Sequence, residues 1–363
     1  MNYKFYKVLF FGFCITVPLI SIADKPNIKI GVIAPLTGGN AIAGEDIRRV
    51  IELAKTRLES TAKKHNYSFI FEDGQCGSGS ATITAVKKLI DLDRVSGLIV
   101  GCSGEILQAG PIVERAKIPT VVVYASHKDV RNLGQFIFRT WIDMERSMDP
   151  MVKLLEQEQA QKVALLTEEM PYTIGMKGLL SEKLGSRIAA AEDIPLDTTD
   201  IRQSLIKVRA KQPDAYYLNA GSAKSIALYL KQAKELGIKG PFYSYLPGEK
   251  EFLEISAAYN EGFRTLSFPE ISATDPVYAK LLEDYRTRYN ELPRYAFLAA
   301  ATHDGVQALI DAFETVGTNA DQVQGYLSSY KTQGALGTVE FDENGDVKNV
   351  TLVVKQVRSG RLE

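Results

Sequence analysis

The sequence predicts an α/β protein with two lobes, each built on a parallel sheet that carries helices on both faces. The chain has 363 residues, which is more than one hydrophobic core usually holds. Short apolar segments, typical of buried strands, alternate with longer segments whose apolar residues recur at helical spacing. The alternation breaks off near Arg139 and starts again at residues 162–168, without a clear sequence repeat. It therefore predicts two units of similar architecture.

The first residues have the pattern of a secretory signal peptide. Lysines precede an uncharged apolar run over residues 8–22, and small residues flank Ile22. We expect residues 1–23 to be a signal peptide that is cut near Ala23. The run of about 15 residues is short for a membrane span, which leaves an uncleaved anchor as the alternative. Cys14 follows a phenylalanine rather than a small residue, so its surroundings do not suggest lipid attachment.

The following part of the chain alternates strands and helices from its start. The run from Ile28 to Ile33 is apolar at most positions and leads into a glycine-rich turn, as a buried strand would. The same patterns predict further strands at 67–74, 97–104 and 119–126, and helices at 47–58, 81–92 and 105–117. The last of these helices is expected despite Pro111.

The second half repeats this order before it changes. Strands are expected at 162–168, 214–221 and 240–245, and helices at 173–185, 200–212 and 222–237. Two long helices, at 275–290 and 295–317, then precede a hairpin over 337–357 that turns at Asn344-Gly345. The acidic residues around this turn lack the ligand spacing of a calcium loop, so we expect a turn and no metal site.

The charge balance gives no reason to expect nucleic acid or an anionic membrane as a partner. The chain has 43 basic and 44 acidic residues and a net charge of -1, which fits a small or neutral ligand better. No nucleophile elbow, phosphate-binding loop or dinucleotide-binding glycine pattern occurs. The three histidines, His65, His127 and His303, lack metal-ligand spacing. We therefore expect no enzymatic activity, no cofactor and no bound metal.

Two cysteines, Cys76 and Cys102, remain after removal of the signal peptide, 26 positions apart. In a secreted chain such a pair suggests one disulfide. Closing a loop of this length stabilises a fold by roughly 3.5 kcal/mol in the chain-entropy treatment. Two free buried thiols are the alternative.

Small and hydroxyl-bearing residues collect where the predicted strands of the first half end. Ligands of open α/β sheets bind beyond these carboxyl ends. The segments concerned are 35–39, 73–76, 102–104 and 124–126. Ser103 stands at the start of a helix, where its hydroxyl and the N–H groups that follow can hold a carboxylate without a lysine. An equally open alternative is that Ser103 only caps its helix.

Several segments, taken in their order and spacing, resemble the periplasmic branched-chain amino-acid binding proteins of ABC importers, which are type I periplasmic binding proteins. The segments are KIGVIAPLTG, EDGQC followed by GCSGE, AKIPTVVVYAS, FIFRTWIDMERS, DAYYLNAG, KQAKELGIKGPF and GTVEFDENGDVKN. The resemblance implies two α/β lobes, joined by three crossing strands, that close on a ligand. The expected lobes are residues 24–141 with 269–328, and residues 142–268 with 329–363.

The resemblance also implies a disulfide between Cys76 and Cys102, and a set of ligand-binding residues. In this family the serine that matches Ser103 binds the ligand's α-carboxylate, helped by backbone and a hydroxyl of the segment that matches residues 124–126. A tyrosine that matches Tyr172 approaches the ligand from the other lobe. The ligand-binding residues expected on this basis are Ser103, Gly104, Tyr124, Ala125, Ser126 and Tyr172.

Departures from the family pattern leave the ligand's amino group without an assured partner. The acid that receives it normally follows the strand matching PFYSY, where this chain reads SYLPGEKEF. Leu246 or Glu249 takes that place, and Asp304 of the other lobe is a second candidate. A missing partner would point to a carboxylate ligand with no amine, such as an aromatic or aliphatic acid. Tyr124 replaces a usually small residue, and Ala43 replaces a frequent aromatic.

We therefore expect a periplasmic solute-binding protein of an ABC importer. It would bind an amino acid or another small carboxylate between its lobes and present the closed form to the permease subunits in the membrane. A periplasmic sensor of the same fold, signalling to a membrane receptor or kinase, is the alternative. The only tryptophan, Trp141, lies at the first expected crossing, where we expect hinge packing ahead of ligand stacking.

Overall fold

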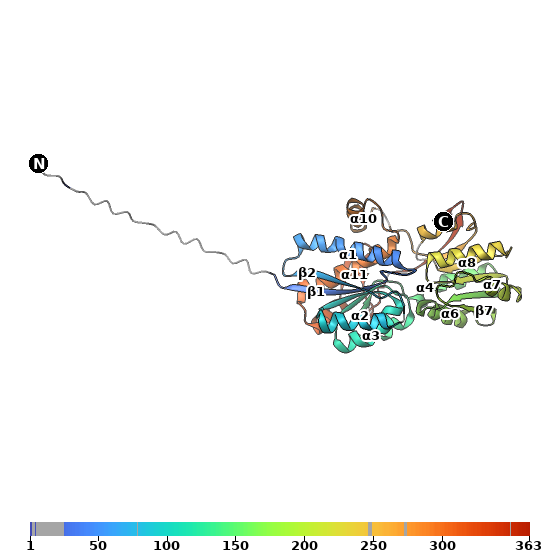
Figure 1. Cartoon of the computed structure of the whole chain (residues 1–363), viewed down its shortest axis with the longest axis horizontal. Coiled ribbons are helices and arrows are strands. Elements are labelled where there is room, and N and C mark those ends of the chain that lie inside the picture. Colours follow the sequence, from blue (N-terminus) through green and yellow to red (C-terminus); the bar gives the residue numbers. More distant parts are fainter. Residues whose placement is uncertain (2–3, 5–24, 78, 246–248, 272–273, 349) are drawn as a thin grey trace.

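The computed structural model describes residues 1, 4, 25–77, 79–245, 249–271, 274–348 and 350–363. The predicted signal peptide lies outside these residues except for its first and fourth positions. Within the described part, no helix has the length and apolar character needed to span a bilayer. Two α/β lobes lie side by side (Figure 1), which confirms the predicted fold class.

The first lobe is built on a five-stranded parallel sheet with the order β2-β1-β3-β4-β5. Every residue of the central strand β3 is buried, which explains the uninterrupted apolar run that predicts it. The strands are β1 (Asn27–Ala34), β2 (Asn66–Asp73), β3 (Gly97–Cys102), β4 (Thr120–Tyr124) and β5 (Ile137–Arg139).

Helices cover both faces of this sheet (Figure 1). Ile30 of β1 packs in one core with Ile47 of α1, whereas Ile33 packs in another core with Ile106 of α3. Alternate side chains of one strand thus face opposite helix layers. The helices of this lobe are α1 (Ala41–Thr61), α2 (Ser80–Lys87), η1 (Lys88–Leu92), α3 (Ser103–Ala116), η2 (Lys128–Asn132), α10 (Pro276–Tyr289), α11 (Ala296–Val316) and α12 (Ala320–Ser328).

The second lobe is built on a seven-stranded sheet with the order β14-β13-β10-β9-β8-β6-β7. Its strands from β6 to β10 run parallel, and β13 pairs antiparallel with β10 and β14. The strands are β6 (Val163–Glu168), β7 (Ile188–Ile194), β8 (Ala215–Asn219), β9 (Phe242–Tyr245), β10 (Arg264–Ser267), β13 (Val353–Arg358) and β14 (Arg361–Leu362).

Two helix layers cover the second sheet as well. Leu205, Ile226 and Phe252 of three helices form one core with the strands, and Met151 and Leu179 belong to the core on the other face. The helices are α4 (Met144–Ser147), α5 (Asp149–Gln157), α6 (Pro171–Leu184), η3 (Gly185–Arg187), α7 (Arg202–Arg209), α8 (Ala223–Glu235) and α9 (Glu249–Ser256).

The chain passes between the lobes three times, between β5 and α4, between β10 and α10, and between β12 and β13. The predicted second lobe includes residues 329–363, but the structure packs residues 331–347 against the first. There β11 (Lys331–Gly334) pairs with β12 (Gly337–Glu340), and β11 contacts α10 and α11. The Asp304 carboxylate of α11 fixes this ribbon, because it accepts hydrogen bonds from two of its backbone N–H groups.

The hairpin predicted over 337–357 is wrong except for its turn. The turn at Asn344-Gly345 is present, closed by a bond from Gly345 N to Asp342 O and by a bridge between Phe341 and Val347. Beyond it the two strands part, since β12 pairs with β11 in the first lobe and β13 pairs with β10 in the second. The alternating apolar residues of β12 and β13 are therefore buried in different lobes, and the two strands do not pair with each other.

A buried arginine, Arg139, ties the first crossing to the third. Its guanidinium pairs with Asp346 at 2.7 Å and with Asp143 at 2.9 Å, and it donates to the carbonyl oxygens of Ala125 and His127. The arginine is completely buried, so each of its bonds replaces one to water. Removing one partner of such a buried pair leaves an uncompensated charge.

We predict that Arg139→Met lowers the free energy of unfolding by about 3–5 kcal/mol, because the buried Asp346 carboxylate loses both of its 2.7 Å bonds and keeps, of its described ion pairs, only those with Arg131 and Arg146, each at 3.8 Å. The control is Lys280→Met, which breaks the exposed pairs of Lys280 with Glu283 and Asp284 and should cost less than about 1 kcal/mol. Thermal unfolding followed by circular dichroism measures both. Equal shifts in the two variants would contradict the role given to Arg139.

Candidate ligand-binding site between the lobes

A cavity lies where the carboxyl ends of the two sheets face each other. Its volume is about 30 Å³, and its walls come from both lobes. The first lobe and the first crossing contribute residues that follow or end β1, β2, β3, β4 and β5, and the second lobe contributes residues at the ends of β6, β8 and β9. The lining residues are Asn40, Cys76, Cys102, Ser103, Tyr124, Ser126, Trp141, Met170, Tyr172, Gly221 and Tyr245. This is the place where open α/β sheets bind ligands.

A disulfide and a buried carboxylate fix the start of α3 at the wall of this cavity. The predicted bond between Cys76 and Cys102 is present, with 5.0 Å between the two Cα atoms. The Glu105 carboxylate accepts one hydrogen bond from Cys102 N at 2.8 Å and another from Cys76 N at 3.1 Å. The loop after β2 and the end of β3 are therefore joined both by sulfur and by one shared side chain.

Ser103 is the first residue of α3, and Cys102 holds the capping position. The hydroxyl oxygen of Ser103 accepts a hydrogen bond from His127 N at 3.3 Å, which leaves its hydrogen free to donate. The backbone N–H groups of a first helical turn have no partner within the helix, and the helix dipole places partial positive charge there. The capping alternative for the Ser103 side chain is therefore not what the structure shows.

A second hydroxyl, that of Ser126, stands in the same wall. It accepts a hydrogen bond from the indole Nε1 of Trp141 at 2.9 Å, so its own hydrogen also points elsewhere. Because Arg139 binds the carbonyl oxygens of Ala125 and His127, the backbone on either side of Ser126 is held in place. Both serine hydroxyls are thus oriented by neighbours that donate to them.

Tyr245 at the end of β9 approaches this wall from the second lobe. Burial raises the pKa of its phenol well above the usual value, as does the neighbouring Tyr124, while hydrogen-bond interactions with the side chains of Ser126 and Trp141 lower it. Tyr245 is 4% exposed, and its hydroxyl lies beside Ser126 and Trp141 without completing a hydrogen bond of standard geometry to any described residue. A buried hydroxyl without a partner at the edge of a cavity is suited to binding a ligand.

The remaining described contacts add no catalytic group. Nowhere in the described part do three or more histidine, cysteine or acidic side chains come together as metal ligands. The model of the periplasmic binding protein family matches residues 27–361.

The chain belongs to the periplasmic binding protein family.

Relatives and solved structures agree with this family. The chain is 24% identical over 368 residues to the Leu/Ile/Val-binding protein homolog 8 of Brucella melitensis, covering 94% of this chain and 90% of the relative. A leucine binding protein of Thermotoga maritima aligns with a TM-score of 0.80 at 24% identity, over 93% of this chain and 97% of the other. An R. palustris solute binding protein in complex with benzoate aligns with a TM-score of 0.81 at 16% identity, over 93% and 95%. The family and these relatives are solute-binding proteins, not enzymes.

In this periplasmic binding protein, four of the eight predicted ligand-binding residues line the cavity. These residues are Ser103, Tyr124, Ser126 and Tyr172. The disulfide that joins the end of β3 to the loop after β2 lines the cavity beside them. Trp141 lines it too, and at the same time packs against Phe268 and Phe297 of the second crossing and the start of α11. The alternatives of hinge packing and ligand contact for this tryptophan are therefore compatible.

Two predicted residues lie just behind the wall instead of in it. Ala125 is fully buried and offers its carbonyl to Arg139. Gly104 is pressed against the disulfide loop, because a Cβ there would lie 2.7 Å from Gly77 O and 2.9 Å from Cys76 O. The absence of a side chain at this position lets the loop approach the start of α3.

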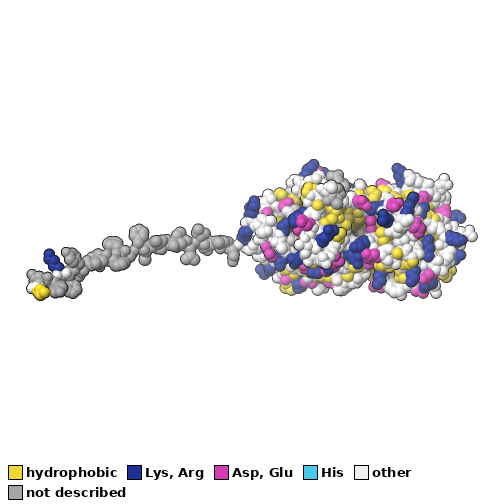
Figure 2. Space-filling model, turned by 90° about the horizontal axis from the view of Figure 1, so that it is seen from above, with side chains coloured by type: hydrophobic (Ala, Val, Ile, Leu, Met, Phe, Trp, Pro, Cys, Tyr) yellow, Lys and Arg dark blue, Asp and Glu magenta, His cyan; other side chains and the backbone are white. Residues whose placement is uncertain are grey.

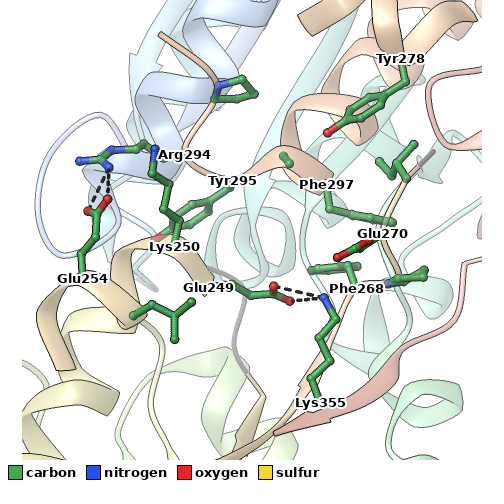
Figure 3. Close-up of a pocket in the computed structure, with 15 residues that line it drawn as sticks. Glu249, Lys250, Glu254, Phe268, Glu270, Tyr278, Arg294, Tyr295, Phe297 and Lys355 are labelled. Atoms are coloured by element: carbon green, nitrogen blue, oxygen red, sulfur yellow. Dashed lines mark hydrogen bonds and ion pairs between the residues drawn. The ribbon is translucent and has the colours of Figure 1, made fainter. Parts of the chain in front are cut away.

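The two acids considered for a ligand amine lie elsewhere. Asp304 binds Ala335 N and Leu336 N, at 2.7 and 2.8 Å, and lies beside His303. Glu249 lies on a larger open groove of about 500 Å³, where it pairs with Lys355 at 3.3 Å (Figure 3). Hydrophobic side chains gather where the lobes meet on the face seen in Figure 2.

Sequence reasoning missed four residues that line the cavity, namely Asn40, Met170, Gly221 and Tyr245. The three from the second lobe follow or end strands that the sequence does predict. Residues at the carboxyl ends of the second lobe's strands are as well placed for a ligand as those of the first lobe, so their positions in the sequence were a usable signal. Asn40 immediately precedes α1 and does not cap it with its side chain.

The lobes touch each other at two places. His127 of the first lobe packs on Gly175 of α6, where a Cβ would lie 2.4 Å from the imidazole Cδ2. The Tyr295 hydroxyl, before α11, donates to Glu251 of α9 at 2.8 Å, and Arg294 pairs with Glu254 of the same helix at 3.1 Å (Figure 3). These contacts join the lobes directly and describe a closed arrangement.

The pKa of Glu105 makes stability depend on pH. Burial, reinforced by Asp73, raises this pKa from 4.5 to about 7, although the N–H groups of Cys102 and Cys76 oppose the shift. Between pH 4.5 and about pH 7, the Glu105 side chain is therefore protonated in the folded state and ionised in the unfolded state. Stability falls as the pH rises through this window, on the order of 3 kcal/mol in total.

We predict that Glu105→Gln removes this part of the pH dependence. The thermal midpoint of the native protein should fall between pH 5 and pH 7 more steeply than that of the variant, because glutamine does not titrate. Glu283→Gln, an exposed position on α10, should behave like the native protein. Parallel melting curves for the native protein and Glu105→Gln would show that Glu105 titrates at its ordinary pKa.

Proposed function

We propose that this chain is the periplasmic solute-binding protein of an ABC importer and that it captures a small carboxylate between its lobes. The observation that carries the proposal is the convergence of the start of α3, Ser103 and Ser126 on one wall of a small cavity between two sheets. Support comes from the family and from solved structures of the same fold, described as complexes with isoleucine and with benzoate.

The carboxylate site needs no cationic side chain. Unpaired N–H groups and the positive end of the dipole at the first turn of α3 attract the anion. The hydroxyl groups of Ser103 and Ser126 each have a hydrogen to donate, because their oxygens already accept from His127 N and Trp141 Nε1. Bonds from neutral donors to a buried carboxylate are among the stronger hydrogen bonds of proteins.

The solute acts by stabilising the closed form. A ligand that contacts both lobes binds the closed state better than the open state, and this difference in affinity shifts the equilibrium. The contacts of His127 with Gly175 and of Arg294 with Glu254 form only when the lobes meet. The closed form is then the species that the permease subunits receive.

We predict that carboxylates raise the thermal midpoint of the native protein. A ligand at a hundredfold excess over its dissociation constant adds about 2.7 kcal/mol to the free energy of unfolding. A thermal-shift screen of amino acids, aliphatic acids and aromatic acids, each paired with its amide or alcohol analogue, measures this. Stabilisation only by compounds that lack a carboxylate would refute the proposal.

We predict that Ser103→Ala weakens the binding of such a carboxylate roughly tenfold to a hundredfold, since a hydrogen bond to a charged group contributes about 1.5–3 kcal/mol. The emission of Trp141, the only tryptophan of the chain, reports binding in the cavity wall. Ser60→Ala, on the exposed end of α1, is the matched control. An unchanged dissociation constant for Ser103→Ala would remove this serine from the site.

A further inference from the structure

The cavity between the lobes contains no negative charge among its described lining residues. These residues are an asparagine, two disulfide-bonded cysteines, two serines, a methionine, a glycine and four aromatic side chains. Residues 246–248, which follow β9 in the sequence, are Leu-Pro-Gly and add no carboxylate. An ammonium group closed into this space would lack a countercharge, and an unpaired buried charge is costly.

Four carboxylates near the cavity walls already have partners. Burial and, in addition, the charge of Glu251 raise the pKa of the lining Tyr124, and Glu251 accepts a hydrogen bond from the Tyr295 hydroxyl at 2.8 Å. Glu105 accepts from the N–H groups of both cysteines, behind the wall. Glu168, at the end of β6, accepts from Gly221 N and from Ser225 Oγ, both at 2.9 Å, and does not line the cavity. Glu249 faces Lys355 in the larger groove. None of them is placed to receive an ammonium group in the cavity.

The four aromatic rings that line the cavity form two pairs, one on the first-lobe side and one on the second-lobe side. Tyr124 and Trp141 meet edge to face on the first-lobe side, with ring centres 5.1 Å apart. Tyr172 and Tyr245 meet on the second-lobe side, with ring centres 5.9 Å apart. Closing the lobes brings these pairs against whatever lies between them. Rings pack favourably against rings in tilted and edge-to-face arrangements.

Two buried polar atoms of the cavity have no hydrogen-bond partner in the described structure, the Tyr245 hydroxyl and Asn40 Oδ1. The phenol lies near Ser126 and Trp141, so it can donate to the same anion from the opposite lobe. The amide oxygen of Asn40 is a neutral acceptor, which suits a hydroxyl group of a ligand. It does not supply the charge that an ammonium group requires.

We propose that the solute is an aromatic monocarboxylate without an amino group, whose carboxylate is held by Ser103 and Ser126 from one lobe and by the Tyr245 hydroxyl from the other. The inference rests on the proposed function and narrows its ligand class. It also makes Tyr245 the residue through which the anion joins the two lobes.

Titration calorimetry with matched pairs tests the ligand class. The pairs are 3-phenylpropanoate with L-phenylalanine and 4-methylpentanoate with L-leucine, together with benzoate, 4-hydroxybenzoate and benzamide. We expect an aromatic acid to bind most tightly and each amine-free member to bind at least about a hundredfold more tightly than its amino acid.

Tighter binding of L-leucine or L-phenylalanine than of their amine-free partners would overturn the inference while leaving the carboxylate site in place. Tighter binding of 4-methylpentanoate than of every aromatic acid would overturn the aromatic part. Binding of benzamide in preference to benzoate would overturn the proposed function as well. A protein that binds no member of the panel would also overturn the inference.

Tyr245→Phe tests the donor from the second lobe, because it removes only the hydroxyl. Tyr217→Phe is the matched control, since the Tyr217 hydroxyl is also buried without a described partner but does not line the cavity. We expect Tyr245→Phe to weaken benzoate binding at least about tenfold and Tyr217→Phe to leave it unchanged. Equal affinities of the two variants, at unchanged melting temperature, would overturn the role of Tyr245.

Discussion

The fixed position of the first turn of α3 is the constraint on which the rest of the site depends. The Cys76–Cys102 disulfide and the two backbone bonds accepted by Glu105 hold this turn against the loop after β2. A helix start offers directed N–H groups to an anion only if the chain before it cannot turn away. The turn is held here by a covalent bond and by a carboxylate that is itself buried.

Arg139 extends this rigid frame from the anion site to the hinge. It holds the backbone on both sides of Ser126, and it pairs with Asp143 in the first crossing and Asp346 near the third. The second serine of the site and two of the three crossings therefore share one side chain. The wall proposed to bind the anion belongs to the first lobe and its hinge, while the second lobe supplies the tyrosines on the opposite side. Such a division suits a protein that must first admit its solute and then enclose it.

The sequence was sufficient for the features that depend on local pattern. Buried parallel strands are nearly continuous apolar runs, so β1, β3, β4, β6 and β8 could be located, and strand ends pointed to Ser103 and Ser126. The edge strand β7 was missed because its residues are small or charged and mostly not buried. The partner of β12 was also missed, since a strand's alternation does not say which neighbour pairs with it.

Residues whose role depends on distant contacts could not be read from the chain. Asp304 was a candidate for a ligand amine, but its position on α11 turns it towards the loop at residues 335–336. Glu249 follows the strand after which the family places its amine-binding acid. It pairs instead with Lys355 of β13, which lies more than a hundred positions later in the chain. Tyr245 was within a predicted strand, and only the meeting of the two sheets makes its hydroxyl part of the site.

A crystal structure of the protein with its bound solute tests the central claim most directly. The account predicts a carboxylate with its oxygen atoms within hydrogen-bond distance of the Ser103 hydroxyl and the first N–H groups of α3, enclosed by Tyr172 and Tyr245 of the other lobe. A solute bound instead in the larger groove beside Glu249 and Lys355, or one whose carboxylate points away from α3, would contradict it.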